Sequence, residues 1–309
     1  MYDSLATAQD LIRLFEILSS YKDKNGKFPV FTIVSLVANP GFDKIKAAEY
    51  ERYFSEPFIN TLARYQLEDA WPLWRQGKIE NLFYPEFHGR EHLNVPVWLR
   101  ALQRGDEETL FAFDESCWGF KNNHPLGIKY QAAFALDKKE DLYFQKEAIR
   151  GLELFEKLHG YKASFFVPPN GPFNSSLEKV AAEGGINYMS ASKIQKEELG
   201  GGKTRRVFHW LGQRNGFGQR YLTRNCFFEP SDESKDWVDS CLSEIALAFK
   251  WRKPAVISTH RVNYIGSLSE KNRQQGNQAL KQLLKAILFN WPEVEFLTST
   301  ELGNIIDRT

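Results

Sequence analysis

Short apolar runs alternate with amphipathic segments along most of this 309-residue chain. Runs rich in Val, Ile, Phe or Ala that end at Gly, Pro or polar breaks predict buried strands at residues 29–38, 81–84, 162–167, 186–190, 255–259 and 294–297. An opening helix that Thr7 and Asp10 can cap is followed by expected helices at about 56–78, 95–102, 139–158, 174–183, 237–251 and 268–289. Asn94 can cap the helix at 95–102. Two more strands, about 205–211 and 220–228, are expected to pair across Gly212–Gly218. The alternation favours an α/β fold with parallel strands joined by helices, in an open sheet or a barrel.

The composition limits the classes of partner. There are 40 basic and 39 acidic residues, which leave a net charge of +1. Nucleic acid and anionic membrane surfaces call for a basic excess, so neither is expected as the main partner. The 24 Phe, 12 Tyr and 8 Trp side chains suit the faces of sugars, although most of them are expected to fill the core. The short charged block Lys196–Glu198 is expected to be a solvated face.

Targeting and redox signals are absent from the sequence. Cys117, Cys226 and Cys241 form neither a CxxC pair nor a disulfide framework. The segment Met1–Ser4 lacks the features of a signal peptide, and no apolar run approaches the length of a membrane span. A reducing, cytoplasmic setting is therefore expected.

The segment Pro85–His92 places two histidines four residues apart, directly after an apolar run. That spacing puts His88 and His92 on one side of a helical turn, from which two ring nitrogens can reach one metal ion. The pattern alone also describes two polar loop histidines with no shared task. Pro169, Glu229 and His260 follow other predicted strands, and in such folds these carboxyl ends carry the active residues.

Further polar residues near strand ends allow two interpretations each. Glu229 is either a general base or the ion-pair partner of Arg224. Arg261 either binds a carboxylate or phosphate of a substrate or pairs with a nearby acid. Asp114, with Trp118 close by, suits a sugar site, and it suits a helix start equally well.

Several of these segments together resemble the NodB-type polysaccharide deacetylases, a family of carbohydrate esterases. His88 and His92 match the paired metal-binding histidines of that family. Phe166–Gly171 is similar to the loop that walls its substrate groove, and Ser258–Arg261 is similar to its last motif, in which an apolar strand delivers a catalytic histidine. The resemblance runs in order from about residue 80 to the end of the chain.

The likeness is closer to a bacterial subgroup, for which Asn225–Pro230 and His260–Tyr264 look typical. It implies a distorted (β/α) barrel of about seven strands, and we expect residues 1–309 to form it as a single domain. It also implies a divalent metal, often zinc, and a carbohydrate substrate. Pro169, Asn170 and Asn225 would then contact that substrate.

The resemblance implies metal-assisted hydrolysis of an N- or O-acetyl group on a surface or capsular carbohydrate. The metal would lower the pKa of its bound water to about 7 and polarise the acetyl carbonyl. A carboxylate would take the proton from that water, and His260 would protonate the leaving amine or alcohol.

The first motif of the family, an Asp-Asp pair that supplies the base and the third metal ligand, occurs nowhere in this sequence. Either the pair lies on a strand that this chain lacks, or residues 29–38 are the first barrel strand and Asn39 stands at the ligand position. A neutral amide is a much weaker metal ligand than a carboxylate. Val167 also stands where the family has an Arg that orients the base, so both halves of one interaction are missing together. A third ligand is otherwise expected from Glu86, Glu91, Asp114 or Glu229.

Two other functions stay open. A glycoside-cleaving enzyme on the same barrel would pair Glu86 or Glu91 with Glu229, at carboxyl separations of about 5–10 Å. A non-catalytic carbohydrate-binding relative would use the same groove without chemistry.

Overall fold

The computed structural model describes residues 4–308. Its strands are β1 (Phe31–Ser35), β2 (Ala38–Pro40), β3 (Ser55–Pro57), β4 (Phe83–Phe87), β5 (Phe165–Phe166), β6 (Tyr188–Ser190), β7 (Ile194–Gly200), β8 (Lys203–Phe208), β9 (Arg220–Leu222), β10 (Cys226–Phe227) and β11 (Ile257–Ser258). Its α-helices are α1 (Ala8–Leu18), α2 (Phe42–Ala47), α3 (Phe58–Arg64), α4 (Ala70–Ile79), α5 (Val95–Gln103), α6 (Glu107–Asp114), α7 (Leu142–Arg150), α8 (Leu152–His159), α9 (Glu178–Glu183), α10 (Trp237–Lys250), α11 (Glu270–Asn290) and α12 (Ser299–Arg308). Short 3₁₀ helices are η1 (Lys139–Asp141), η2 (Ser175–Leu177) and η3 (Arg261–Tyr264).

Within the described residues, the main sheet has five strands in the order β1-β4-β5-β6-β9. The pairings β4–β5, β5–β6 and β6–β9 are parallel. Helices connect β4 to β5 and β5 to β6, whereas the hairpin β7–β8 connects β6 to β9. Parallel neighbours joined through helices confirm the α/β class that the alternating pattern predicts. The closed barrel of about seven strands stays a prediction.

The chain divides into two compact units. The first comprises residues 1–33, 62–84 and 223–304, and the second comprises 34–61, 85–222 and 305–309. The core of the first unit forms where α1, α4, α10 and α11 bring together Leu14, Leu18, Ile245, Leu283 and Ile287. The single-domain interpretation of the sequence stays a prediction.

The second unit has its core on β4, β5 and β6. Phe87, Phe166 and Met189 from these strands are buried with Phe155 of α8. A further buried cluster surrounds Trp98 of α5. Both helix caps that the sequence predicts are present: the Thr7 side chain accepts from the Asp10 amide in the first unit, and the Asn94 side chain accepts from the Val97 amide in the second.

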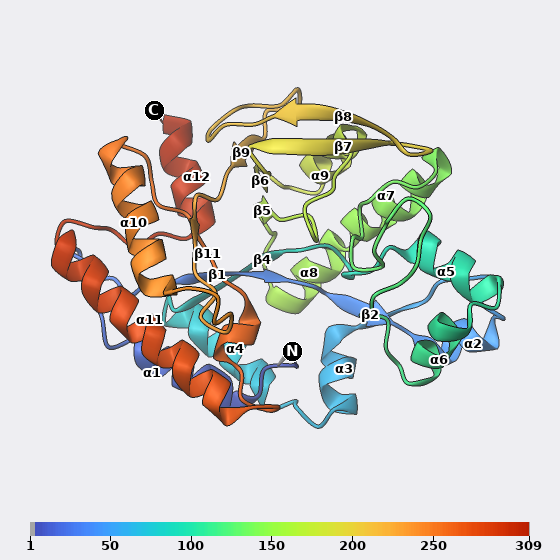
Figure 1. The fold of residues 1–309 in the computed structure, drawn as a ribbon, viewed down its shortest axis with the longest axis horizontal. Coiled ribbons are helices and arrows are strands. Elements are labelled where there is room, and N and C mark those ends of the chain that lie inside the picture. Colours follow the sequence, from blue (N-terminus) through green and yellow to red (C-terminus); the bar gives the residue numbers. More distant parts are fainter. Residues whose placement is uncertain (1–3, 309) are drawn as a thin grey trace. The chain divides into compact units, whose positions relative to one another are not determined.

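The expected pairing of residues 205–211 with 220–228 is wrong. The antiparallel partner of β8 is β7, and the two strands lie side by side (Figure 1). The turn between β7 and β8 consists of Gly200, Gly201 and Gly202, which all have positive φ angles. Only glycine adopts such angles without steric cost. Strand β9 pairs with β6 instead.

Two more expectations need correction. The helix expected over 56–78 is two helices, α3 and α4, because Gln66 between them has a φ of 57° and cannot continue a right-handed helix. Residues 294–297 form no strand in the described chain. There the amide of Phe296 donates to the Asp23 carboxylate at 2.9 Å, so a side chain takes the place of a strand partner.

Candidate functional site

The paired histidines of the second unit lie in the loop between β4 and α5. Residues 88–94 are irregular, so the predicted helical turn is wrong. The reason is Gly89, whose φ of 101° lies in the region that a right-handed helix excludes. The loop nevertheless brings the two rings together, with the centroids of His88 and His92 5.1 Å apart and their planes at 66°.

The orientation of His88 is fixed by a backbone carbonyl. Its Nδ1 lies 2.6 Å from the carbonyl oxygen of Val167, the residue after β5. A carbonyl only accepts, so Nδ1 carries the proton and Nε2 is the nitrogen that can bind a metal or take up a proton. His92 stacks on Trp118, with ring centroids 6.4 Å apart and planes at 20°. Trp118 thus lies next to a histidine ring, and its role in a sugar-binding site stays a prediction.

Each carboxylate proposed as a third ligand within the second unit has another contact. Glu86 accepts the backbone amides of Ser164 and Phe165 at 2.9 and 3.0 Å. Glu91 is fully buried, and both of its oxygens accept from the Arg90 guanidinium, at 2.6 and 3.0 Å. These contacts give Glu86 and Glu91 structural roles.

Asp114 and Asn39 also lie in other surroundings. Asp114 is exposed at the end of α6 and pairs with Lys46 at 2.7 Å. Asn39 is the middle residue of β2, and its amide nitrogen donates to the Thr61 hydroxyl at 2.9 Å. Among residues 4–308 there is no group of three His, Cys, Asp or Glu side chains that could hold a metal ion. Metal binding by His88 and His92 therefore stays a prediction, because the described carboxylates do not complete a ligand set around them.

The loop after β5 is the segment that the resemblance predicts to wall a substrate groove, and that role stays a prediction. Val167 and Pro169 are buried, and Asn170 is exposed with a φ of 55°. Gly171 follows with a φ of 89°. Two successive residues in the left-handed region reverse the chain sharply here, so the loop presents Asn170 at the surface.

In the first unit, Glu229 and His260 come together as the strand ends predict. Strands β10 and β11 pair in parallel, so the residues that follow them emerge at the same edge. The Nδ1 of His260 lies 2.6 Å from Glu229 Oε1. The His260 side chain is 69% exposed, whereas that of Glu229 is only 21% exposed. An exposed imidazole anchored by a shielded carboxylate is suited to proton transfer.

Asn263, which was not predicted as a site residue, completes this arrangement. Its amide nitrogen donates to Glu229 Oε2 at 2.8 Å and to the backbone carbonyl of His260 at 2.9 Å. The side-chain oxygen Oδ1 of Asn263 accepts a hydrogen bond from the Ser231 backbone amide at 2.9 Å. Asn263 is fully buried on η3, three residues after His260. That spacing on a helical turn was the available signal.

The remaining predicted residues of the first unit surround this cluster. The side chain of Asn225 accepts the Val256 amide at 2.7 Å and donates to the Pro254 carbonyl at 2.9 Å, which ties β10 to the segment before β11. Arg224 donates to the Ser258 hydroxyl at 2.9 Å. Glu229 forms an ion pair with His260, a role that differs from both roles the sequence leaves open for it, general base and partner of Arg224. Arg261 is exposed at the start of η3.

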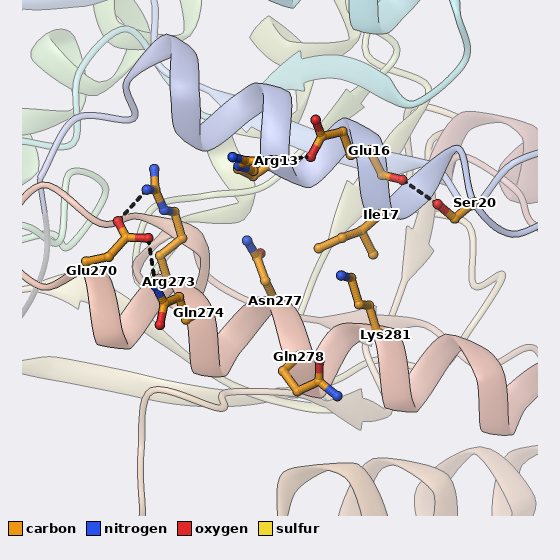
Figure 2. A pocket seen from close by; sticks show the side chains of 10 residues that line it. All are labelled: Arg13, Glu16, Ile17, Ser20, Glu270, Arg273, Gln274, Asn277, Gln278 and Lys281. Carbon is orange, nitrogen blue, oxygen red and sulfur yellow. Dashed lines mark hydrogen bonds and ion pairs between the residues drawn. The ribbon is translucent and has the colours of Figure 1, made fainter.

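Two cavities lie away from all of these residues. The larger, about 520 Å³, lies between α1 and α11 in the first unit (Figure 2). Its lining is polar and charged, and Arg13–Glu16 on one helix and Glu270–Arg273 on the other form ion pairs within it. The smaller, about 170 Å³, lies in the second unit.

No family model and no curated protein matches this sequence. Among solved structures, a polysaccharide deacetylase from Mycobacterium smegmatis is similar with a TM-score of 0.49 and 13% identity, covering 97% of this chain and 77% of that one. A de-N-acetylase from Aggregatibacter actinomycetemcomitans matches with a TM-score of 0.30 and 16% identity, over 55% of this chain and 50% of that one. A GH57-type branching enzyme from Pyrococcus horikoshii gives a TM-score of 0.44 and 10% identity, over 98% and 64%. In the described part of the chain, every helix is too short or too polar to span a membrane.

Proposed function

We propose that this protein is a hydrolase that removes acetyl groups from a carbohydrate, with His260 as its acid–base residue. The observation that carries the proposal is the contact of His260 Nδ1 with Glu229 at 2.6 Å, supported from the other carboxylate oxygen by Asn263. The order of sequence segments that resemble the NodB-type deacetylases supports the substrate class.

The chemistry of the proposed step follows from the protonation of His260. The Glu229 carboxylate holds the proton on Nδ1, so Nε2 is the basic nitrogen of the neutral ring. Nε2 takes a proton from the attacking water, and the oxygen of that water bonds to the acetyl carbon. Nε2 then returns the proton to the sugar oxygen or nitrogen as the bond to the acetyl carbon breaks. Glu229 stabilises the imidazolium between the two events, as the carboxylate of a catalytic triad does.

Asn263 is a positioning residue in this proposal. It holds Glu229 and the backbone carbonyl of His260 together, so the carboxylate cannot rotate away from the ring. The buried Asn263 side chain also donates to the Thr259 hydroxyl at 3.1 Å, and its four hydrogen bonds favour a single geometry of the arrangement.

The histidine pair of the second unit supports the same class of function in a second way. The Val167 carbonyl fixes the ring of His88, and Trp118 offers an aromatic surface beside His92. A divalent metal such as zinc, if bound to His88 and His92, would be held by the second unit and would supply Lewis-acid chemistry there. Because the described carboxylates leave the ligand set incomplete, no step of the proposed mechanism depends on that metal.

The experiment is an assay of acetate release by the purified chain on N-acetylated chitooligosaccharides and on O-acetylated xylan. Wild-type protein is expected to release acetate from one of the two classes. His260→Ala is expected to lower the rate by about 10²–10⁴-fold, the usual contribution of a general acid–base residue. Glu229→Gln is also expected to lower the rate, because a neutral amide stabilises the imidazolium less than a carboxylate does. Glu233→Gln is its control, because it makes the same chemical change at an exposed position of the same unit.

The outcomes separate the proposal from its alternatives. New reducing ends without acetate would indicate glycoside cleavage, and binding of the sugars without either product would indicate a carbohydrate-binding protein. Acetate release that survives His260→Ala unchanged would remove His260 from the mechanism.

A further inference from the structure

The smaller cavity, in the second unit, is lined on one side by the hairpin β7–β8. Side chains alternate between the two faces of a strand. Gln195 and Glu197 of β7 line the cavity with Arg205 and Val207 of β8, whereas Arg206, at the alternate position, does not line it. The expectation that the charged block Lys196–Glu198 is a solvated face is therefore wrong at its centre.

The wall of this cavity contains buried charge. Glu197 is 1% exposed and accepts from the amide and hydroxyl of Ser175, both at 2.8 Å, and from the Arg205 guanidinium. Burial opposes its charge, but the hydrogen bonds from Arg205 and Ser175 outweigh burial and lower the pKa of Glu197. Glu178 accepts from the Tyr221 hydroxyl, and burial raises the pKa of Glu178. The cavity therefore contains one firmly ionised carboxylate and one that protonates more readily.

His209 lies in the same wall with both ring nitrogens next to amide oxygens. Its Nε2 is 2.7 Å from Gln195 Oε1, and its Nδ1 is 3.2 Å from Gln213 Oε1. Other contacts fix both amides, because Gln195 donates to the Phe173 carbonyl and Gln213 accepts the amide of Trp210. The ring centroid of His209 is 4.1 Å from that of Tyr221. The wall is thus held rigidly by side chains from several segments, which is how binding sites are built.

The balance of charge restricts the ligand. Two carboxylates, Glu178 and Glu197, are matched by two guanidiniums, Arg205 and Arg214. The carboxylates would repel an anion and the guanidiniums would repel a cation. For either kind of ion, this repulsion would offset the attraction to the groups of opposite charge. A purely apolar ligand would remove water from these charged groups and offer them no hydrogen bond in return.

A hydroxyl group both donates and accepts, so neighbouring hydroxyls can donate to a carboxylate while they accept from a guanidinium or an amide. Tyr221 and Val207 add apolar surface for the carbon atoms between the hydroxyls. A volume of about 170 Å³ is far more than a single water needs. We propose that this cavity binds one neutral hydroxylated ring, that is, a single monosaccharide unit. The inference does not depend on the proposed deacetylation, because it requires binding alone.

The test measures binding to the full chain by saturation-transfer difference NMR, followed by titration for Kd. The probes are the methyl glycosides of glucose, galactose and N-acetylglucosamine, with glucuronate and glucosamine as charged counterparts. At least one neutral glycoside is expected to bind, and to bind at least fivefold more tightly than both charged sugars. Equal or tighter binding of a charged sugar would overturn the proposal, as would no binding of any neutral one.

Two variants locate the binding. Arg214→Ala removes an exposed guanidinium whose partner, Asp307, keeps a second ion pair with Arg220, so the fold is preserved. It is expected to weaken binding about tenfold, whereas Arg206→Ala, on the other face of the hairpin, leaves Kd unchanged. Val207→Phe fills the cavity and is expected to abolish binding at unchanged Tm.

Binding that ignores both Arg214→Ala and Val207→Phe would place the sugar elsewhere and overturn the proposal. Binding lost in His260→Ala would assign the sugar to the proposed acetyl-hydrolysing site and would overturn it equally. Loss of acetate release with binding intact would instead count against the proposed function alone.

Discussion

The packing of α11 against η3 gives a prediction with a magnitude that the structure sets. Gly276 on α11 is buried where the helix crosses Asn263. A Cβ atom placed on Gly276 would lie 1.7 Å from the Asn263 carbonyl oxygen and 2.8 Å from its carbonyl carbon. Real Cβ contacts essentially never fall below 3.0 Å, so η3 and α11 must separate by about 1.3 Å in the variant Gly276→Ala.

Two terms of opposite sign decide the outcome. Alanine favours a helix over glycine by about 1 kcal/mol. Overpacking a rigid contact costs about 1–3 kcal/mol and occasionally more, and here the obstacle is backbone and not a flexible side chain. Since Asn263 also holds Glu229, the separation should disturb the His260–Glu229 contact as well. Because backbone atoms cannot move aside, the upper half of that cost applies, about 2–3 kcal/mol. Less the helix term of about 1 kcal/mol, this gives an expected net loss of stability of about 1–2 kcal/mol, together with a loss of catalytic rate.

Urea unfolding at fixed pH measures the free energy, and acetate release measures the site. Gly216→Ala is the matched control, because its Cβ would meet nothing within 4 Å and its φ is not in the left-handed region. The control is expected to change stability by less than about 0.5 kcal/mol. If Gly276→Ala were as stable as wild type or more so, the close approach of α11 to η3 would be refuted.

Three other perturbations test separate parts of the account. Asp10→Ala removes the 2.8 Å partner of the buried Arg273 guanidinium, which keeps its ion pair with Glu270, and it removes the acceptor of the Thr7 and Gly266 amides. It is expected to cost about 1–3 kcal/mol in urea unfolding, and a loss below about 0.5 kcal/mol would show that these contacts are dispensable. Burial lowers the pKa of His209 below its ordinary value of 6.5, so the unfolded chain binds more protons than the folded one as pH falls below 6.5. The contribution of His209 to folding stability is therefore fully present above pH 6.5 and is lost as pH falls. His209→Gln should therefore flatten the fall of Tm from about pH 7 to 5, and an unchanged slope would contradict this. Zinc titration by calorimetry is expected to show weak binding that His88→Ala or His92→Ala abolishes, and tight binding in both variants would reveal another ligand set.

The sequence predicts what depends on local pattern. The capping residues Thr7 and Asn94 and the helices they begin are confirmed, because caps and apolar periodicity act over a few residues. The meeting of Glu229 with His260 follows from the apolar runs before them, since parallel strands bring their carboxyl ends to one edge.

The features that could not be predicted from the sequence depend on contacts between distant segments or on the backbone angle of a single residue. Strand β7 is highly charged, and its buried Glu197 is stabilised by Ser175 and Arg205, which no local pattern indicates. Gly89 turns the histidine loop away from a helix, although both imidazoles still meet. The buried Asn263 is recognisable only once Glu229 is placed next to it.

The most direct test of the central claim is chemical rescue of His260→Ala. On the acetylated substrate that wild-type protein hydrolyses fastest, the variant is expected to release acetate about 10²–10⁴-fold more slowly. Added imidazole is expected to restore part of this rate, with a pH dependence that follows the protonation of free imidazole. Exposure of the His260 side chain gives the small base room to enter. A variant that releases acetate at the wild-type rate, with or without imidazole, would contradict the proposed role of His260.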